Sequence, residues 1–286
     1  MFLVKVNATS ANVCVGFDVL GLALDIQNEF SFEISNEFSF KGFEKQYCTI
    51  TNNLVYKSYC KVFELLNKKI IPVTISYKGE VPVSRGLGSS STLIVAGIFG
   101  ANAILGNPLS KDELFNLACK IEGHPDNVAP AIYGGLIASY KANDCYNTIS
   151  YEISKDLKFI TIIPPYKLST NEARKALPKF LPYSDIVNNL SRIVNIPYAF
   201  KNGDINLLKE LFNDKLHEPY RGKLIKDYEN IKNDLKDLEC AMAISGSGSS
   251  MLVITKKTDI VLDKLKKYNY DIKIVGVGSK VIVEEV

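Results

Sequence analysis

Hydrophobic and polar residues follow two different periods along this chain. Residues 29–34 alternate as in a half-buried strand, whereas apolar side chains within residues 54–66 recur at helical spacing. Residues 93–105 are apolar almost throughout, which indicates a helix buried on all sides. Ser110 and Glu113 have the spacing of a capping box and predict that another helix starts there. The chain therefore contains both helices and strands.

The same patterns assign the remaining elements. The order of helices and strands shows no regular βαβ alternation, so it predicts an α+β fold instead of a doubly wound parallel sheet. Strands are expected at residues 2–6, 73–77, 134–140, 159–163, 240–245, 250–254, 271–277 and 280–285. Helices are expected at residues 184–200, 204–213, 222–238 and 257–267.

A polar, turn-rich stretch near residues 144–150 divides the chain. A chain of 286 residues is long enough for one large domain or two smaller lobes. We therefore expect an N-terminal lobe over residues 1–150 and a C-terminal lobe over residues 151–286.

Composition narrows the class of protein but not its chemistry. With 47% hydrophobic and 23% charged residues, the chain is neither a disordered protein, a collagen-like fibre nor a coiled coil. A net charge of +3 gives no electrostatic case for binding nucleic acid or a membrane surface. No apolar run approaches the length of a transmembrane helix, and the first residues do not read as a signal peptide. We therefore expect a cytoplasmic protein.

Cysteine and histidine usage excludes several kinds of site. The six cysteines form no C-x-x-C pair, so we expect neither a disulfide framework nor a zinc site. We expect reduced thiols instead. Two histidines are too few for a three-histidine metal site. The G-x-S-x-G motif of many hydrolases is absent.

The most informative segment is the glycine- and serine-rich loop ahead of the apolar helix. Successive glycines let backbone amides converge on an anion, and a helix N-terminus favours negative charge. The loop is neither a Walker A loop, since no lysine follows Gly88, nor a G-x-G-x-x-G fingerprint. The residues alone leave two interpretations: a nucleotide loop, or a tight entry to a buried helix. The predicted nucleotide-binding residues are Pro82, Val83, Ser84, Arg85, Gly86, Leu87, Gly88, Ser89, Ser90, Ser91 and Thr92.

Three motifs in this chain resemble those of the GHMP kinases. Residues 82–90 read P-x-x-x-G-L-G-S-S, as in the ATP loop of that family. Residues 8–12 (A-T-S-A-N) with residues 16–18 (G-F-D) resemble its first motif, and residues 245–248 (S-G-S-G) resemble its third. The motifs occur in the family's order and cover nearly the whole chain.

Three further blocks resemble one branch of this family, the homoserine kinases. They are residues 122–130 (E-G-H-P-D-N-V-A-P), residues 169–174 (S-T-N-E-A-R) and residues 219–221 (P-Y-R). The resemblance implies a two-lobed GHMP kinase fold with ATP and substrate in the cleft between the lobes. It also implies ATP-dependent phosphorylation of the side-chain hydroxyl of L-homoserine to O-phospho-L-homoserine, a step of threonine biosynthesis. The alternatives are a GHMP kinase for another small alcohol and a non-catalytic relative that binds ligand.

The resemblance also assigns the nucleotide end of the site. Glu122 is implied as the carboxylate ligand of Mg²⁺, with Ser89 or Ser90 as a hydroxyl ligand. Without the family, Glu122 would read as a solvated carboxylate at a helix end. Asn53 is implied at the adenosine end, although it could equally cap a helix. The third motif contributes Gly246, Ser247 and Gly248.

For the substrate, the resemblance implies a polar pocket that matches an amino-acid head group. Arg174 and Arg221 are expected to bind the carboxylate, because a planar guanidinium suits it. Asp18 and Asp126 suit the ammonium group. Members of the family are often dimers, so a homodimer is also considered. The side chains expected to complete the pocket are Asn12, His124 and Thr170.

The catalytic base is left open between two residues. Aligned on the His-Pro-Asp-Asn block, Asp126 takes the place of the aspartate that some relatives use as a base. Aligned backward from the two glycines at residues 134–135, the matching residue is Asn127, which cannot act as a base. We therefore expect catalysis by positioning and electrostatics.

Overall fold

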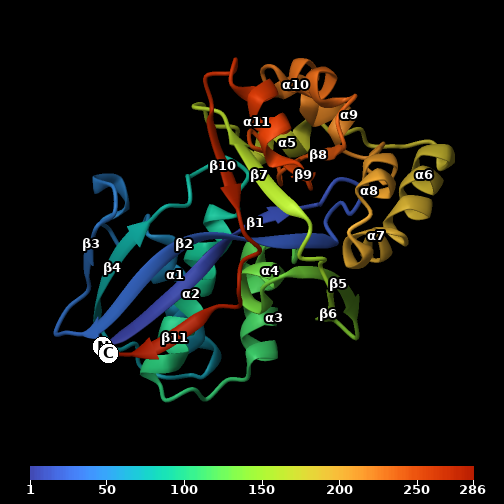
Figure 1. Cartoon of the computed structure of the whole chain (residues 1–286). Coiled ribbons are helices and arrows are strands. Elements are labelled where there is room, and N and C mark those ends of the chain that lie inside the picture. The colour runs from blue at the N-terminus through green and yellow to red at the C-terminus, as the bar shows by residue number, and fades with distance from the viewer.

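A computed structural model describes residues 1–286, and two β-sheets dominate it (Figure 1). The larger sheet has seven strands, of which only one pair is parallel. Its strands are β1 (Phe2–Ala11), β2 (Leu20–Ile34), β3 (Ser39–Lys41), β4 (Val73–Gly79), β5 (Leu136–Ala142), β6 (Cys145–Tyr151) and β11 (Ile282–Glu285). The main path runs β11-β1-β2-β4-β3, and the β5–β6 hairpin is attached to β2.

The smaller sheet has four antiparallel strands in the order β10-β7-β9-β8. They are β7 (Lys158–Ile163), β8 (Cys240–Ile244), β9 (Met251–Thr255) and β10 (Asp271–Val275). Two mostly antiparallel sheets with helices packed on them confirm the predicted α+β fold.

The chain leaves the first sheet at the end of β6 and enters the second at β7. The expected division between residues 150 and 151 lies inside β6, one residue before that strand ends. Residues 282–285 were grouped with the C-terminal lobe, but β11 pairs with β1 in the first sheet. The two chain ends consequently lie side by side, and the Val286 amide donates to the Met1 carbonyl at 2.9 Å (Figure 1).

Four helices belong to the first half: α1 (Leu54–Leu65), α2 (Ser89–Ile104), α3 (Lys111–Glu122) and α4 (Val128–Tyr133). α2 is buried along almost its whole length, as its composition predicts. It begins at Ser89, four residues earlier than expected, because Gly88 has a left-handed φ of 68° that ends the loop there. The capping box at Ser110 and Glu113 is present at the start of α3.

The second half carries most of the short helices, and a shared core joins it to the first. Leu22 and Leu24 of β2 belong to the same hydrophobic cluster as Phe159 of β7 and Ile254 of β9. The halves are therefore packed together by apolar contact. The helices of the second half are α5 (Thr170–Lys175), α6 (Tyr183–Ile193), α7 (Ile196–Asn202), α8 (Ile205–Leu211), α9 (Glu218–Arg221), α10 (Tyr228–Leu235) and α11 (Thr258–Leu265). A single 3₁₀ turn lies in each half, at Lys45–Tyr47 and at Gly222–Leu224.

Several predicted elements differ from the structure. The single helix expected at residues 184–200 is two helices, and Pro197 lies in the first turn of α7, where proline is tolerated. The helix expected at residues 222–238 is shorter in the structure, where it is α10. Asp227 precedes it with a left-handed φ of 61°, so the helix cannot extend further toward the N-terminus. The polar stretch at residues 144–150 forms strand β6, which is mostly exposed and so lacks an apolar signal. None of the helices combines the length and apolar character needed to cross a membrane.

Candidate active site

A cavity of about 520 Å³ lies between the two halves of the molecule. Loops from both sheets, the end of α3 and helices α5 and α9 contribute to its wall. The fold thus brings together most of the side chains singled out from the sequence. Those that line it are Asn12, Asp18, Asn53, Val83, Ser84, Arg85, Gly86, Gly88, Ser89, Ser90, Glu122, His124, Asp126, Asn127, Thr170, Arg174, Arg221, Gly246 and Ser247.

Other predicted residues lie behind this wall instead of in it. Leu87 is fully buried in the apolar core. The Thr92 hydroxyl is bonded to the Ser89 carbonyl and to Asn28, both at 2.8 Å. These side chains can support the loop but cannot contact a ligand in the cavity. The residues outside the lining are Pro82, Leu87, Ser91, Thr92 and Gly248.

The glycine loop packs too closely against neighbouring segments to leave room for side chains at Gly86 and Gly88. A Cβ on Gly86 would lie 2.2 Å from the Ser245 carbonyl oxygen, and one on Gly88 would lie 1.9 Å from the Thr9 hydroxyl. The Ser245 hydroxyl donates to the Gly86 carbonyl at 2.7 Å. Beyond Gly88, α2 begins with backbone amides that have no partner inside the helix, and no acidic side chain occupies its first turn. This helix end can accept an anion.

Glu122 stands at the end of α3, opposite the first turn of α2. The hydroxyls of Ser90 and Ser91 each donate to one of its carboxylate oxygens at 2.8 Å. Ser89, the other predicted metal ligand, lines the cavity without bonding to Glu122. Glu122 and Ser90 therefore place oxygen atoms, the ligands that Mg²⁺ prefers, beside the N-terminus of α2.

His124 and Asp126 form a close pair at the cavity wall. The His124 Nδ1 lies 2.7 Å from the Asp126 Oδ1, and Asp126 is only 2% exposed. Burial lowers the pKa of His124, but the hydrogen bond and charge of Asp126, together with the charges of Glu122 and Asp18, raise the pKa overall. Next in sequence, the Asn127 amide oxygen accepts from the Thr9 hydroxyl at 2.7 Å.

Asp18 and Arg174 bind each other across the cavity. Two guanidinium nitrogens donate to the two carboxylate oxygens at 2.9 and 3.0 Å. This hydrogen-bonded pair raises the pKa of Arg174. Asp18 is held in place by Asn12, whose side-chain oxygen accepts from the Asp18 amide at 3.1 Å. The sequence predicts that these two charges bind opposite ends of a ligand, and in this structure each satisfies the other.

Arg221 is a buried charge without a counter-ion. It is 2% exposed, and its nearest partners are neutral: the Gly246 carbonyl at 3.0 Å and the Ala173 carbonyl at 3.4 Å. Its guanidinium also lies 5.1 Å from the centre of the Phe17 ring. Burial and the nearby charge of Arg174 lower the pKa of Arg221. A carboxylate in the cavity would complete this environment.

The third glycine motif forms the far side of the cavity. Asn12 donates to the Gly246 carbonyl at 2.9 Å, and Ser247 lies 3.3 Å from the Thr170 hydroxyl. Gly248 faces away from the cavity, since a Cβ there would lie 2.6 Å from the Ile225 side chain. The motif therefore joins α5, α9 and the loop after β1.

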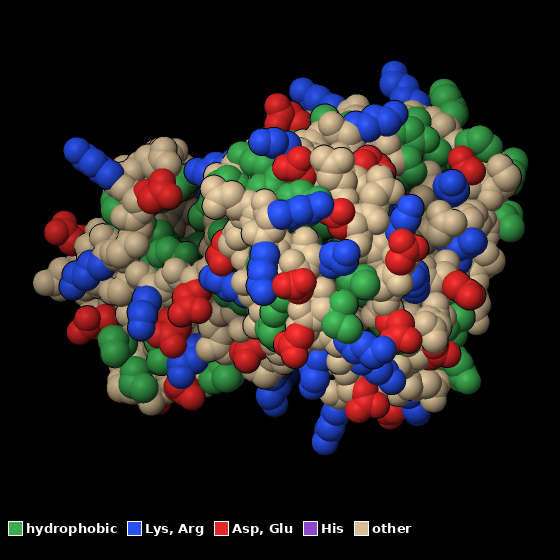
Figure 2. Space-filling view, turned by 45° about the horizontal axis from the view of Figure 1, so that its top comes forward, with side chains coloured by type: hydrophobic (Ala, Val, Ile, Leu, Met, Phe, Trp, Pro, Cys, Tyr) green, Lys and Arg blue, Asp and Glu red, His purple; other side chains and the backbone are tan.

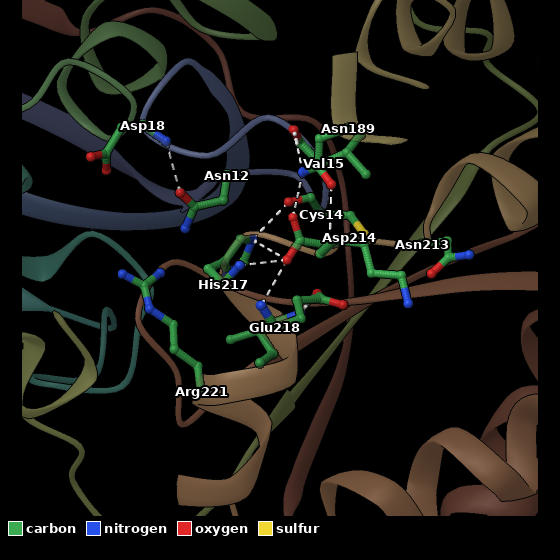
Figure 3. A network of polar contacts seen from close by, with 12 residues as sticks. Asn12, Cys14, Val15, Asp18, Asn189, Asn213, Asp214, His217, Glu218 and Arg221 are labelled. Carbon is green, nitrogen blue, oxygen red and sulfur yellow. Dashed lines mark hydrogen bonds and ion pairs between the residues drawn. The ribbon is translucent and has the colours of Figure 1, made fainter. Parts of the chain in front are cut away.

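A buried polar network lies beside Arg221 (Figure 3). The Asp214 carboxylate accepts from the backbone amides of His217 and Glu218 at 2.7 and 2.8 Å, and from Asn189 at 2.6 Å. The His217 Nε2 reaches the Cys14 carbonyl at 2.7 Å. These bonds fix the start of α9 against the loop that carries Asn12 and Asp18. The two sides of the polar pocket are therefore held in a fixed position relative to each other.

One end of the cavity was missed from the sequence. Phe43 and Tyr77 stack there with ring centres 5.0 Å apart. Asn53 lines the same end and caps α1, accepting from the Tyr56 amide at 3.0 Å, so its capping role is confirmed. Its contact with the adenosine end of a nucleotide stays a prediction. The aromatic side chains clustered before residue 48 were the available signal. The lining residues missed are Ala11, Phe43, Glu44, Tyr47, Asn52, Leu54, Tyr77 and Leu93.

Comparison with known proteins identifies the family. Residues 53–135 match the model of the GHMP kinases N-terminal domain, and residues 198–271 match that of the GHMP kinases C-terminal domain. A homoserine kinase of Clostridium beijerinckii is 43% identical over 94% of this chain and 91% of its own length. One of Clostridium botulinum is 42% identical over 89% and 86%.

Solved structures agree with these matches. A homoserine kinase from Cytophaga hutchinsonii superposes with a TM-score of 0.87 at 26% identity, covering 99% of this chain and 97% of that one. A heptose 1-phosphate kinase at 15% identity and a TM-score of 0.76 shares the fold. The chain therefore belongs to the GHMP kinase family and, within it, to the homoserine kinases. The predicted family and its two-lobed fold are confirmed.

Proposed function

We propose that this chain transfers the γ-phosphoryl group of ATP to the side-chain hydroxyl of L-homoserine. The products are O-phospho-L-homoserine and ADP, and the reaction is a step of threonine biosynthesis. Its relatives at about 40% identity are homoserine kinases. The observation that carries the proposal is the buried, uncompensated guanidinium of Arg221 in the same cavity as the glycine loop. All six cysteines are free, in keeping with an enzyme of the reducing cytoplasm.

The nucleotide is assigned to the N-terminus of α2 and the aromatic end of the cavity. Backbone amides of the glycine loop suit the phosphates, and Phe43, Tyr77 and Asn53 suit the base and sugar. The oxygens of Glu122 with Ser89 or Ser90 fit Mg²⁺, which neutralises phosphate charge when it is bound.

The amino-acid head group is assigned to the opposite end. Arg221 binds the carboxylate, and a zwitterion inserted between Asp18 and Arg174 replaces their mutual contacts. Its ammonium group then neutralises Asp18, while Arg174 gains the carboxylate. Asn12, His124 and Thr170 surround this position. A substrate without both charges leaves these groups unpaired, which is the basis of selectivity.

Catalysis is assigned to positioning. Phosphoryl transfer passes through a loose transition state that needs alignment and charge neutralisation more than a strong base. The Asn127 amide cannot take a proton, and Asp126 is already held by His124. Asp126 and Asn127 therefore orient the reacting hydroxyl, and its proton leaves to phosphate or water.

The most direct functional test is acceptor specificity. Purified protein with Mg-ATP is offered L-homoserine, L-serine, mevalonate or galactose, and ADP release is followed. We expect release above the acceptor-free control with L-homoserine only, because the other acceptors lack its reach or its two charged groups. Preference for mevalonate or galactose would contradict the proposal. Thermal stabilisation by homoserine without turnover would indicate a binding protein instead.

Arg221→Ala tests the carboxylate site. Loss of a charge-assisted bond in a buried position should raise the KM for L-homoserine about 100-fold, whereas the KM for ATP should change by no more than about threefold. Arg221→Lys, which keeps the charge but not the planar fork, should fall between. Lys179→Ala on the exposed segment before α6 is the control. Equal effects on both substrates would rule out this role.

Asp126→Asn distinguishes positioning from base catalysis. The substitution keeps the shape and one hydrogen bond to His124, so measurable turnover should remain in steady-state assays. A fall in kcat of about 10⁴-fold or more, the upper range for a general base, would instead identify Asp126 as the base. Asp144→Asn is the matched control, since that side chain is 96% exposed and does not line the cavity.

A further inference from the structure

One aromatic ring, that of Phe17, contacts both of the arginines assigned to the substrate. The centre of the ring lies 5.1 Å from the guanidinium carbon of Arg221 and 5.8 Å from that of Arg174, within the range of cation–π contacts. Phe17 does not belong to the cavity lining. An influence of this ring on a ligand in the cavity must therefore pass through the arginines.

Arg221 has no carboxylate within hydrogen-bond distance. Its side chain donates to neutral carbonyls, and the nearby positive charge of Arg174 repels it. Exposed charges are better compensated, since lysine and arginine side chains are interspersed with aspartate and glutamate on the face shown in Figure 2. The face of an aromatic ring is negative and attracts a cation that lies over it. Phe17 thus stabilises the Arg221 charge by direct contact.

Arg174 depends on the ring most when a ligand is bound. Its side-chain hydrogen bonds, at 2.9 and 3.0 Å, both go to Asp18. Under the proposed function a zwitterion takes over these contacts, and the Arg174 side chain then loses its partner within the protein. The contact with Phe17 does not compete with the ligand, because the ring lies outside the cavity lining. Phe17 can therefore hold the guanidinium in place during the exchange.

His217 holds the Phe17 ring itself. The two rings stack with centres 5.3 Å apart and an angle of 28° between their planes. His217 is fully buried, and its Nε2 donates at 2.7 Å to the carbonyl of Cys14, which lies in the same loop as Phe17. Arg221 follows His217 by one helical turn, since the Arg221 amide donates to the His217 carbonyl at 2.9 Å (Figure 3). The ring is thus supported by the same turn of chain that carries the Arg221 guanidinium.

The loop that carries Phe17 has an unusual backbone conformation. Asn12, Cys14 and Asp18 have left-handed φ values of 71°, 62° and 56°. Such values are uncommon for residues other than glycine and persist where the surrounding structure imposes them. In this conformation Phe17 and Asp18, adjacent in sequence, both reach Arg174. One short loop therefore supplies the ring and the carboxylate that hold this guanidinium.

We propose that Phe17 is a positioning residue for the carboxylate site, whose ring holds the guanidiniums of Arg174 and Arg221 in the arrangement that binds the ligand. The inference rests on the proposed function, because it takes L-homoserine as that ligand. Loss of the ring should weaken the binding of homoserine and leave the binding of the nucleotide unchanged.

Phe17→Leu removes the aromatic face and keeps an apolar side chain. By calorimetry, the Kd for L-homoserine should rise about tenfold, whereas the Kd for ADP should change by less than about twofold. Phe17→Tyr keeps the face and should stay within about threefold of wild type. Tyr268→Leu is the matched control, since that ring also contacts a cation, Lys267 at 5.4 Å, but lies outside the cavity lining. Phe17→Met replaces Phe17→Leu if the latter lowers the Tm by more than a few degrees.

A double-mutant cycle shows whether the ring acts through Arg221. Arg221→Ala alone is expected to weaken homoserine binding about 100-fold, so two independent losses would multiply to about 1,000-fold. If Phe17 positions the guanidinium, the double variant should be only about 100- to 300-fold weaker, because the ring then has only Arg174 to hold. A double variant about 1,000-fold weaker would overturn the inference. So would a Phe17→Leu variant that binds homoserine as tightly as wild type does.

Turnover separates this inference from the proposed reaction. If wild type binds homoserine but releases no homoserine-dependent ADP, the reaction is refuted, and the ratio of the Kd values still decides the role of Phe17. A wild-type chain that does not bind homoserine would refute both. Equal increases in the Kd values for homoserine and ADP in Phe17→Leu would show a general structural role and would overturn the inference alone.

Discussion

The site depends on close contact between two backbone segments from different halves of the molecule. The glycine loop before α2 and the loop between β8 and β9 meet at Gly86 and Ser245, where no side chain fits on the glycine. This contact sets the N-terminus of α2, which can bind phosphates, against Gly246 and its neighbour Arg221. The shared core around β2 and β7 keeps the two halves together, so the glycine loop of one half shares a cavity with Arg174 and Arg221 of the other.

The substrate end is held ready by buried polar groups. Asp214 fixes the first amides of α9, and Asn12 ties the loop after β1 to Gly246. Burial of the Arg221 charge is costly by itself, and a ligand carboxylate relieves that cost. Under the proposed function, the Asp18–Arg174 pair would behave in the same way, because each of its members would exchange the other for one end of a zwitterion. We propose that the binding energy of homoserine arises at these three charged side chains.

The fold class and the polar site could be predicted from the sequence, because both depend on local patterns and family motifs. The buried α2, the capping box of α3 and the glycine loop are all encoded in short stretches. The aromatic end of the cavity was missed because Phe43 and Tyr77 meet only through tertiary packing. The mutual pairing of Asp18 and Arg174, 156 residues apart, could not be derived from spacing. The orientation of α6, which buries Asn189 and exposes Val187 and Leu190, could not be predicted either, since periodicity reveals an apolar face but not the direction in which it points.

On the proposed function, an amino-acid head group replaces internal contacts at Asp18, Arg174 and Arg221. A crystal structure of the chain with L-homoserine and a non-hydrolysable ATP analogue tests it most directly. The homoserine carboxylate should lie within hydrogen-bond distance of Arg221 and Arg174, with the Asp18–Arg174 pair opened and the side-chain hydroxyl directed at the γ-phosphate. Homoserine bound elsewhere, with the Asp18–Arg174 pair intact and Arg221 still bonded only to backbone carbonyls, would contradict it.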